Sequence, residues 1–169
     1  MREMTAELFE LDVEVVCITT NGFVKANGEA VMGRGCAKQL AEAFPRSPRI
    51  LGSMIQRHGN IVQPILMHDG TIAVAFPVKH GTAINDGTNV VAHAASKYHI
   101  GQSVAGFHLK ADIALIEQSA KQLVDWVDAR GFTSVALPRA GCGCGELTWE
   151  QVKPVLDTIL DDRFIAVTL

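Results

Sequence analysis

Long hydrophobic runs are missing from this sequence of 169 residues. The apolar stretch Val13–Ile18 has the length of a β-strand, whereas a membrane-spanning helix needs about 20 apolar residues. The first residues, from Met1 to Met4, lack the basic and then apolar pattern of a secretory signal peptide. We therefore expect a cytoplasmic protein without a membrane partner.

Cysteine is scarce, and its spacing does not suit a metal centre. Of the four cysteines only Cys142 and Cys144 are close, and one Cys-x-Cys pair provides at most half of a zinc site. The histidines lack zinc-protease spacing, because His93 and His99 would not share a helix face. The sequence thus predicts neither a metal nor a cofactor.

An excess of positive charge is missing as well. The chain has 15 lysines and arginines against 18 aspartates and glutamates, and its net charge of −3 gives no bulk attraction for nucleic acid. A local basic groove is compatible with this balance. With 48% hydrophobic and 20% charged residues, the chain is expected to fold as one domain over residues 1–169. We expect this domain to be a monomer.

Five apolar segments have the length and composition of β-strands. They are Val13–Ile18, Ile61–Leu66, Ile72–Phe76, Ser134–Leu137 and Phe164–Thr168. Helical patterns alternate with these segments, which predicts an α/β fold with helices on both faces of a sheet. In such sheets, ligands bind beyond the carboxyl ends of the strands.

Four helices are predicted from apolar periodicity and from residues that begin or end helices. They are Ala37–Phe44, Ser47–His58, Ala111–Arg130 and a last helix that opens at Thr148 with capping-box spacing. Pro154 lies early in this last helix and favours a kink or a later start.

Residues 80–107 interrupt the alternation of strands and helices. This segment is rich in glycine and asparagine and has only a weak helical pattern at Val90–Lys97. We interpret it as an insertion after a strand, with a lid over the site as one role. His80 and Asp86 are candidates for acid–base help from this insertion, although loop residues of this kind are more often merely exposed.

Two glycine-rich loops give the strongest functional signal. Pro138–Gly145 follows a predicted strand and precedes a helix, and Val31–Cys36 directly precedes another helix. Glycines let the backbone approach a ligand closely, and N–H groups at a helix N-terminus favour an anion. Together the two loops predict a site for the two phosphates of a diphosphate.

Side chains near these loops suggest nucleophiles. Lys79 follows an apolar strand, and desolvation in a partly apolar cleft would favour its amine form, which acts as a nucleophile or base. Cys142 lies in a glycine loop at a helix start, where a lowered thiol pKa is expected. No histidine near Cys142 in the sequence offers itself as a partner, so we favour Lys79.

Three ordered sequence blocks resemble the macrodomain family, an ADP-ribose-binding α/β/α module. The blocks are Ala26–Ala37 with Phe44-Pro45 after it, Phe76–Lys79, and Leu137–Trp149. Within the family, the chain is most similar to the branch of the terminal ADP-ribose protein glycohydrolase and the DNA ADP-ribosyl glycohydrolase antitoxins (DarG). The resemblance implies a three-layer α/β/α fold with a mixed central sheet and an insertion after the strand that ends at Lys79.

The resemblance also assigns roles to residues of this chain. Lys79 matches the catalytic lysine of the branch and Asn27 an asparagine beside the distal ribose, so both are candidate catalytic residues. Glu7 falls where the family usually has an aspartate that contacts adenine. The other candidate ligand-binding residues belong to the glycine loops: Val31, Met32, Gly33, Arg34, Gly35, Ala140, Gly141, Cys142, Gly143, Cys144 and Gly145.

One position departs from the protein glycohydrolase. Gly145 stands where that enzyme has an aspartate that completes its lysine chemistry, and the antitoxins also have glycine there. Glu146 is adjacent and would replace this aspartate only if the loop turned its side chain inward.

The resemblance implies a mono-ADP-ribosyl hydrolase that binds ADP-ribose and releases it from a modified partner. That partner is a protein with an ADP-ribosylated acidic side chain, joined by an ester, or DNA modified on thymidine. The negative net charge and the lack of basic runs with aromatics favour protein, whereas the similarity to the antitoxins favours DNA. A non-catalytic ADP-ribose reader and a phosphatase for ADP-ribose 1″-phosphate are the alternatives.

Overall fold

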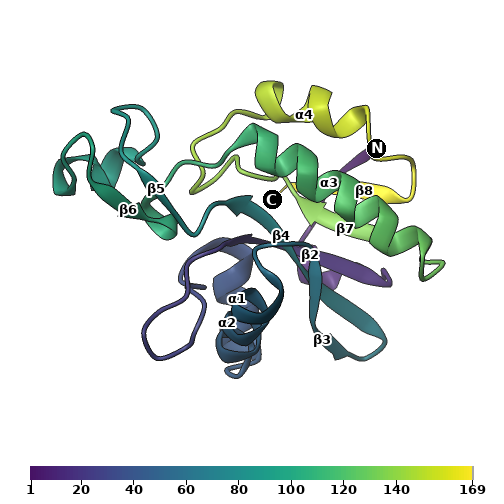
Figure 1. Cartoon of the computed structure of the whole chain (residues 1–169). Helices are drawn as coiled ribbons and strands as arrows, with labels where there is room; N and C mark the ends of the chain where they lie inside the picture. The colour runs from purple at the N-terminus through teal and green to yellow at the C-terminus, as the bar shows by residue number, and fades with distance from the viewer. Residues whose placement is uncertain (169) are drawn as a thin grey trace.

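A single six-stranded sheet forms the centre of the computed structural model, which describes residues 1–168 (Figure 1). Its strand order is β1-β8-β7-β2-β4-β3, and every neighbouring pair is parallel except β3 with β4. The predicted mixed sheet is therefore confirmed. The strands are β1 (Arg2–Thr5), β2 (Val15–Asn21), β3 (Gln63–His68), β4 (Thr71–Lys79), β7 (Val135–Pro138) and β8 (Phe164–Thr168).

Helices cover both faces of the sheet, as the alternating sequence pattern predicts. Figure 1 shows α3 (Ile113–Asp128) and α4 (Trp149–Asp157) on one face, and α1 (Gly35–Ala43) and α2 (Ser47–His58) on the other. The structure thus has three layers. Among residues 1–168, no helix combines the length and the apolar character needed to cross a membrane.

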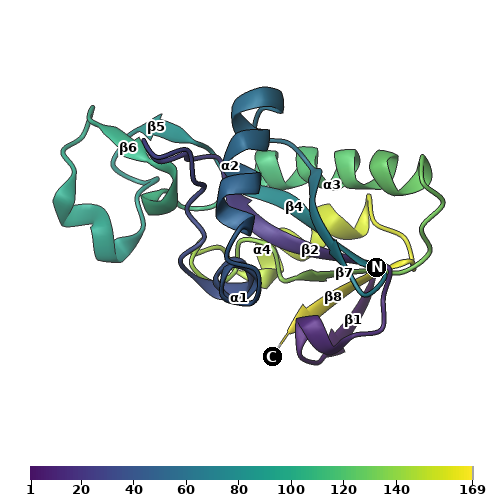
Figure 2. The same ribbon diagram turned by 90° about the horizontal axis from the view of Figure 1, so that it is seen from below.

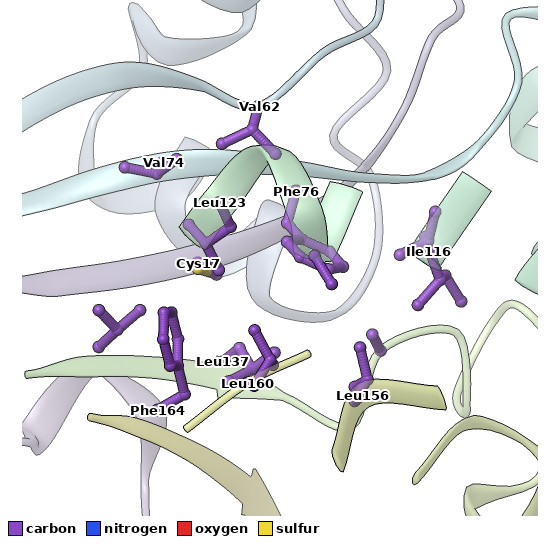
Figure 3. Close-up of a cluster of buried hydrophobic side chains, with 14 of the residues drawn as sticks. Cys17, Val62, Val74, Phe76, Ile116, Leu123, Leu137, Leu156, Leu160 and Phe164 are labelled. Atoms are coloured by element: carbon purple, nitrogen blue, oxygen red, sulfur yellow. The ribbon is translucent and has the colours of Figure 1, made fainter. Parts of the chain in front are cut away.

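The alternation of side chains along β2 divides the core into two clusters. Val15 and Cys17 belong to the cluster under α3 and α4, whereas Val16 and Ile18 belong to the cluster under α1 and α2. In the first cluster, large side chains from the sheet and from α3 fill the space between the layers (Figure 3). A strand buried on both faces reads as a continuous apolar run, which is why the sequence reveals it.

The five predicted strands are all present, with boundaries that differ by a few residues in all but β8. Strand β1 is absent from the sequence prediction because all four of its residues are exposed and show no apolar alternation. It is held by parallel pairing with β8 and by the Met1 amino group, which donates to the Leu160 carbonyl at 2.9 Å.

The predicted helices are also present. α2 has the predicted bounds, and its C-cap Gly59 has a φ of 88°, which favours glycine. α1 begins at Gly35 instead of Ala37, so the end of the first glycine loop is already helical. α4 follows Thr148, whose capping box is complete, and contains Pro154 without a later start.

The insertion folds as a small unit of its own beside the sheet. It contains β5 (Thr82–Ile84) paired with β6 (Ser103–Ala105), and two short 3₁₀ helices, Ala92–Lys97 and Gly106–His108. A separate apolar cluster lies inside it, formed by Val90, Val91, Ala94, Val104 and Leu109. Because Leu109 and Lys110 still pack or bond with this unit, the insertion extends past residue 107, where the sequence pattern ends it.

Glycines form the neck through which the insertion leaves β4. The Gly106 N–H donates to the Gly81 carbonyl at 2.8 Å, and the Gly22 N–H donates to the Lys79 carbonyl at 3.1 Å. A Cβ on Gly106 would overlap the His80 carbonyl oxygen, and one on Gly81 would lie 2.9 Å from the Gly22 oxygen. Close backbone packing, rather than a flexible hinge, therefore holds the insertion at the end of the sheet.

We expect Gly106→Ala to lower the free energy of unfolding by about 1 to 3 kcal/mol, because the new methyl group forces the two backbone segments of the neck apart. Urea denaturation followed by circular dichroism measures the change. Ser103→Ala, at an exposed position on β6, is the control and should shift the value by less than about 0.5 kcal/mol. Equal stability of the two variants would contradict the close packing of the neck.

Candidate functional site

A cavity of about 950 Å³ lies beyond the carboxyl ends of the parallel strands. Residues that follow β1, β2, β4 and β7, together with the end of β8, line it. Figure 2 shows the strands from below, with β1 toward one edge of the sheet and the insertion, which contains β5 and β6, projecting from the β4 side. The two glycine loops, far apart in the sequence, therefore face one cavity, as predicted.

The first glycine loop brings backbone N–H groups to the cavity. Val31, Gly33, Arg34 and Gly35 line the cavity, and Arg34 is the N-cap of α1. The N–H groups of the first helical turn have no intrahelical acceptor, so they are available to an anion. Met32 differs from the prediction, since it is 7% exposed and packs in the core instead of lining the cavity.

The second glycine loop lines the cavity from Gly141 to Gly145. Gly141 has a φ of 75°, and its carbonyl accepts the Leu147 N–H at 3.0 Å, which closes the loop into a compact turn. Ala140 does not line the cavity because its side chain is fully buried in the core. A Cβ at Gly145 would overlap the Gly141 carbonyl, so this loop has no room for a carboxylate at that position.

Lys79, the last residue of β4, reaches from the sheet to the second glycine loop. Its Nζ donates to the Cys144 carbonyl at 2.8 Å, and the residue is only 6% exposed. Burial lowers the pKa of Lys79 below its ordinary value, Arg34 acts in the same direction, and Cys144 and Glu146 oppose it. Lys79 is therefore an ammonium that gives up its proton more readily than an exposed lysine does, which is the direction the sequence predicts.

Glu7 and Arg139 lie toward the β1 side of the same cavity. Glu7 follows β1 and is exposed, whereas Arg139 follows β7 and pairs with Glu3 at 3.4 Å. The Arg139 guanidinium also lies 5.2 Å from the Trp149 ring, so it braces the second loop against α4. Because β1 and β4 are four strand positions apart, the cavity spans roughly 19 Å between its ends.

Asn27 lies outside the cavity lining, which corrects its predicted position. It occupies an exposed turn, where its Oδ1 accepts the Glu29 N–H at 3.0 Å and its Nδ2 donates to the Glu29 carboxylate at 3.2 Å. Asn21, at the carboxyl end of β2, lines the cavity instead. Its Nδ2 donates to the Val31 carbonyl at 3.0 Å and thereby holds the first glycine loop.

Glu146 turns away from the cavity. It adopts a φ of 59°, which is uncommon for a residue with a side chain, and its carboxylate accepts the Ala92 N–H at 2.8 Å. The same carboxylate lies 3.5 Å from the Lys110 amine. Glu146 therefore ties the second glycine loop to the insertion and does not take the place of an aspartate at position 145.

The other predicted acid–base residues also lie elsewhere. The His80 Nε2 and the Asp112 carboxylate are 2.7 Å apart at the base of the insertion, and Asp112 also caps α3. Asp86 accepts bonds from Thr88 and Asn89 within its own turn. Neither His80 nor Asp86 lines the cavity.

The Cys142 thiol does not have the lowered pKa that its loop position suggests. Burial raises the pKa of Cys142, and its Sγ donates to the Ala140 carbonyl at 3.5 Å. The thiol therefore stays protonated and serves packing. Within residues 1–168, no three His, Cys, Asp or Glu side chains are placed to share a metal ion.

Three lining residues come from the insertion and were not found from the sequence: His93, Phe107 and His108. Their positions depend on how the insertion folds back toward β4, which no local pattern encodes. Asn21 was detectable, because an asparagine at the carboxyl end of a predicted strand is a common place for a site residue.

Comparison with solved structures identifies this architecture as the macrodomain fold. The macrodomain of Mycobacterium tuberculosis DarG matches with a TM-score of 0.70 and 20% identity over 98% of this chain and 95% of that one. The macrodomain of Thermus aquaticus DarG matches with a TM-score of 0.68 and 22% identity over 99% and 97%.

A third similar structure contains a ligand. Thermosipho africanus DarTG, solved in complex with ADP-ribose, matches with a TM-score of 0.67 and 19% identity over 96% of this chain and 40% of that one. No family model matches the chain, and no curated protein matches its sequence. The structural matches establish the fold that the sequence blocks predict.

We expect NMR titration of the lysine side chains to give Lys79 a pKa below the usual value of about 10.4, because burial removes water from its ammonium group. Lys79→Arg assigns the resonance. Glu146→Gln should lower the pKa further, since it removes a negative charge that favours the ammonium. A Lys79 pKa at or above the usual value would contradict the effect of burial.

Proposed function

We propose that this protein binds ADP-ribose and hydrolyses the bond between its distal ribose and a modified target. The observation that carries this proposal is the buried Lys79 amine at one end of a cavity whose middle is lined by two loops of backbone N–H groups. The ADP-ribose complex of Thermosipho africanus DarTG, which shares the fold, supports this ligand.

The order of groups along the cavity fits an extended nucleoside diphosphate sugar. Glu7 lies at the β1 end, where adenine would bind, and a glutamate there accepts a hydrogen bond from its amine. The two glycine loops follow β2 and β7 in the middle of the sheet and suit the diphosphate. This order leaves the distal ribose at the β4 end, beside Lys79.

Hydrolysis at that end follows from the chemistry of a neutral amine. The Lys79 Nζ attacks C1″ of the distal ribose, and the bond from C1″ to the target breaks with its electron pair on the departing atom. Water then adds to C1″ and displaces Nζ, which regenerates the lysine and releases ADP-ribose. The departing atom is a carboxylate oxygen for a modified acidic side chain or a ring nitrogen for thymidine.

We expect Lys79→Ala to lower the turnover at least about a hundredfold while free ADP-ribose binds with nearly unchanged affinity. Turnover is measured as ADP-ribose released from three substrates: auto-modified protein, an ADP-ribosylated thymidine oligonucleotide and ADP-ribose 1″-phosphate. Calorimetry measures binding of free ADP-ribose to the same variant.

The three substrates separate the candidate functions. Release from protein or from the oligonucleotide identifies the linkage, and phosphate release alone identifies a phosphatase. A chain that binds ADP-ribose without cleaving any of the three is a reader, which would refute the proposed hydrolysis. Turnover that survives in Lys79→Ala would refute the role of the lysine.

We expect Gly33→Asp to weaken ADP-ribose binding about tenfold to a thousandfold, because it adds a negative charge beside the proposed diphosphate position. The fold has room for the change, since no atom lies within 4 Å of a Cβ built at Gly33. Gln56→Glu, which adds the same charge at an exposed position on α2, is the control for calorimetry. Equal affinities for the two variants would argue against a diphosphate at the first loop.

A further inference from the structure

The β4 end of the cavity has a wall that belongs to the insertion. His93, Phe107 and His108 line it, on the side of the cavity where Lys79 lies. Among the described residues that line the cavity, the carboxylates are Glu7 and Glu42, and neither follows β4. The wall therefore brings imidazoles, which both donate and accept protons, to the end of the cavity where Lys79 lies.

His108 is the better held of the two histidines. Its Nδ1 and the Tyr98 Oη are 2.7 Å apart, and its ring centroid lies 4.5 Å from that of Phe107. His108 is half-buried, whereas His93 is exposed. Because Tyr98 engages Nδ1, the other ring nitrogen, Nε2, is the one left for a ligand; it makes no hydrogen bond within residues 1–168.

We propose that His108, oriented by Tyr98, carries the proton that the reaction must move between Lys79 and the departing atom. This inference rests on the proposed hydrolysis. The His108 imidazole takes the place of an acid–base carboxylate in the second glycine loop, which has no room for one at Gly145.

The proton path balances over one turnover. The neutral imidazole takes a proton from the Lys79 ammonium, and the resulting amine attacks C1″. The imidazolium then gives this proton to the departing atom, which leaves Nζ bonded to C1″ as a secondary ammonium. Water adds to C1″ with cleavage of the C1″–Nζ bond, so ADP-ribose leaves with a new hydroxyl and Lys79 is an ammonium again.

The surroundings of His108 suit a group that begins as a base. Burial lowers its pKa, and the charges of Lys97, His93, Lys79 and Arg34 act in the same direction. This shift favours the neutral imidazole, the form that accepts a proton. His108 and Lys79 line the same cavity, close enough for their charges to interact.

The role of His108 depends on the departing atom. A carboxylate leaves readily as an anion, whereas a pyrimidine nitrogen is much more basic and needs a proton as it leaves. The proton from His108 therefore matters most for a modified base.

The test measures single-turnover rates and ADP-ribose affinity for the whole chain. On a substrate that the wild-type chain cleaves, His108→Ala should lower the rate about a hundredfold or more, with the affinity for free ADP-ribose changed less than twofold. Added imidazole should restore part of the rate to His108→Ala. If both linkages are cleaved, the loss should be larger for the thymidine oligonucleotide than for the ester.

Further variants distinguish proton transfer by His108 from a purely structural role of its side chain in the cavity wall. His108→Gln keeps a hydrogen-bonding group but carries no titratable proton, so it should be as slow as His108→Ala. Tyr98→Phe should give a smaller loss of rate, again without loss of affinity, because it frees the imidazole to turn. His99→Ala, at an exposed position of the insertion outside the cavity lining, is the matched control and should behave as the wild type.

Each result supports or overturns either the role of His108 or the proposed hydrolysis. An unchanged rate in His108→Ala, a full recovery in His108→Gln, or equal losses of rate and affinity would overturn the proton-transfer role while leaving the hydrolysis intact. A wild-type chain that binds ADP-ribose but cleaves nothing would instead overturn the proposed hydrolysis, and the role of His108 with it.

Discussion

Burial of the central strands on both faces is the constraint on which this molecule depends. Strands covered by helices on either side must be apolar throughout, and their crossover connections make them parallel. Parallel strands place their carboxyl ends at one edge, so Asn21, Lys79 and Pro138 meet there although they are distant in the sequence. The polar side chains and backbone N–H groups that can contact a ligand therefore gather at this edge.

Burial of the Lys79 ammonium costs the fold stability. An ammonium group withdrawn from water raises the free energy of the folded state unless it finds partners. Lys79 has the Cys144 carbonyl at 2.8 Å and the nearby charge of Glu146, while Arg34 opposes its charged form. Burial outweighs these partners, so the pKa of Lys79 lies below its ordinary value.

Much of the fold was predictable because its elements carry local signals. Buried strands such as β2 are recognisable as apolar runs, whereas the residues of β1 are all exposed, so its sequence has no apolar pattern that predicts a strand. Among the site residues, Lys79 was predictable from its place at the end of a strand, and the two loops were predictable from their glycine content. Met32 was misplaced because side chains in a loop alternate between cavity and core without a fixed period. His108 was missed because a long insertion must first fold back to bring it there.

The insertion is held in part by Glu146, a residue that lies outside the insertion. The backbone of this residue belongs to the second glycine loop, but its carboxylate serves Ala92 and Lys110. The insertion therefore does not make all of its stabilising contacts within its own residues. Grafting it onto another macrodomain scaffold would lose these two contacts unless the acidic residue were transferred as well.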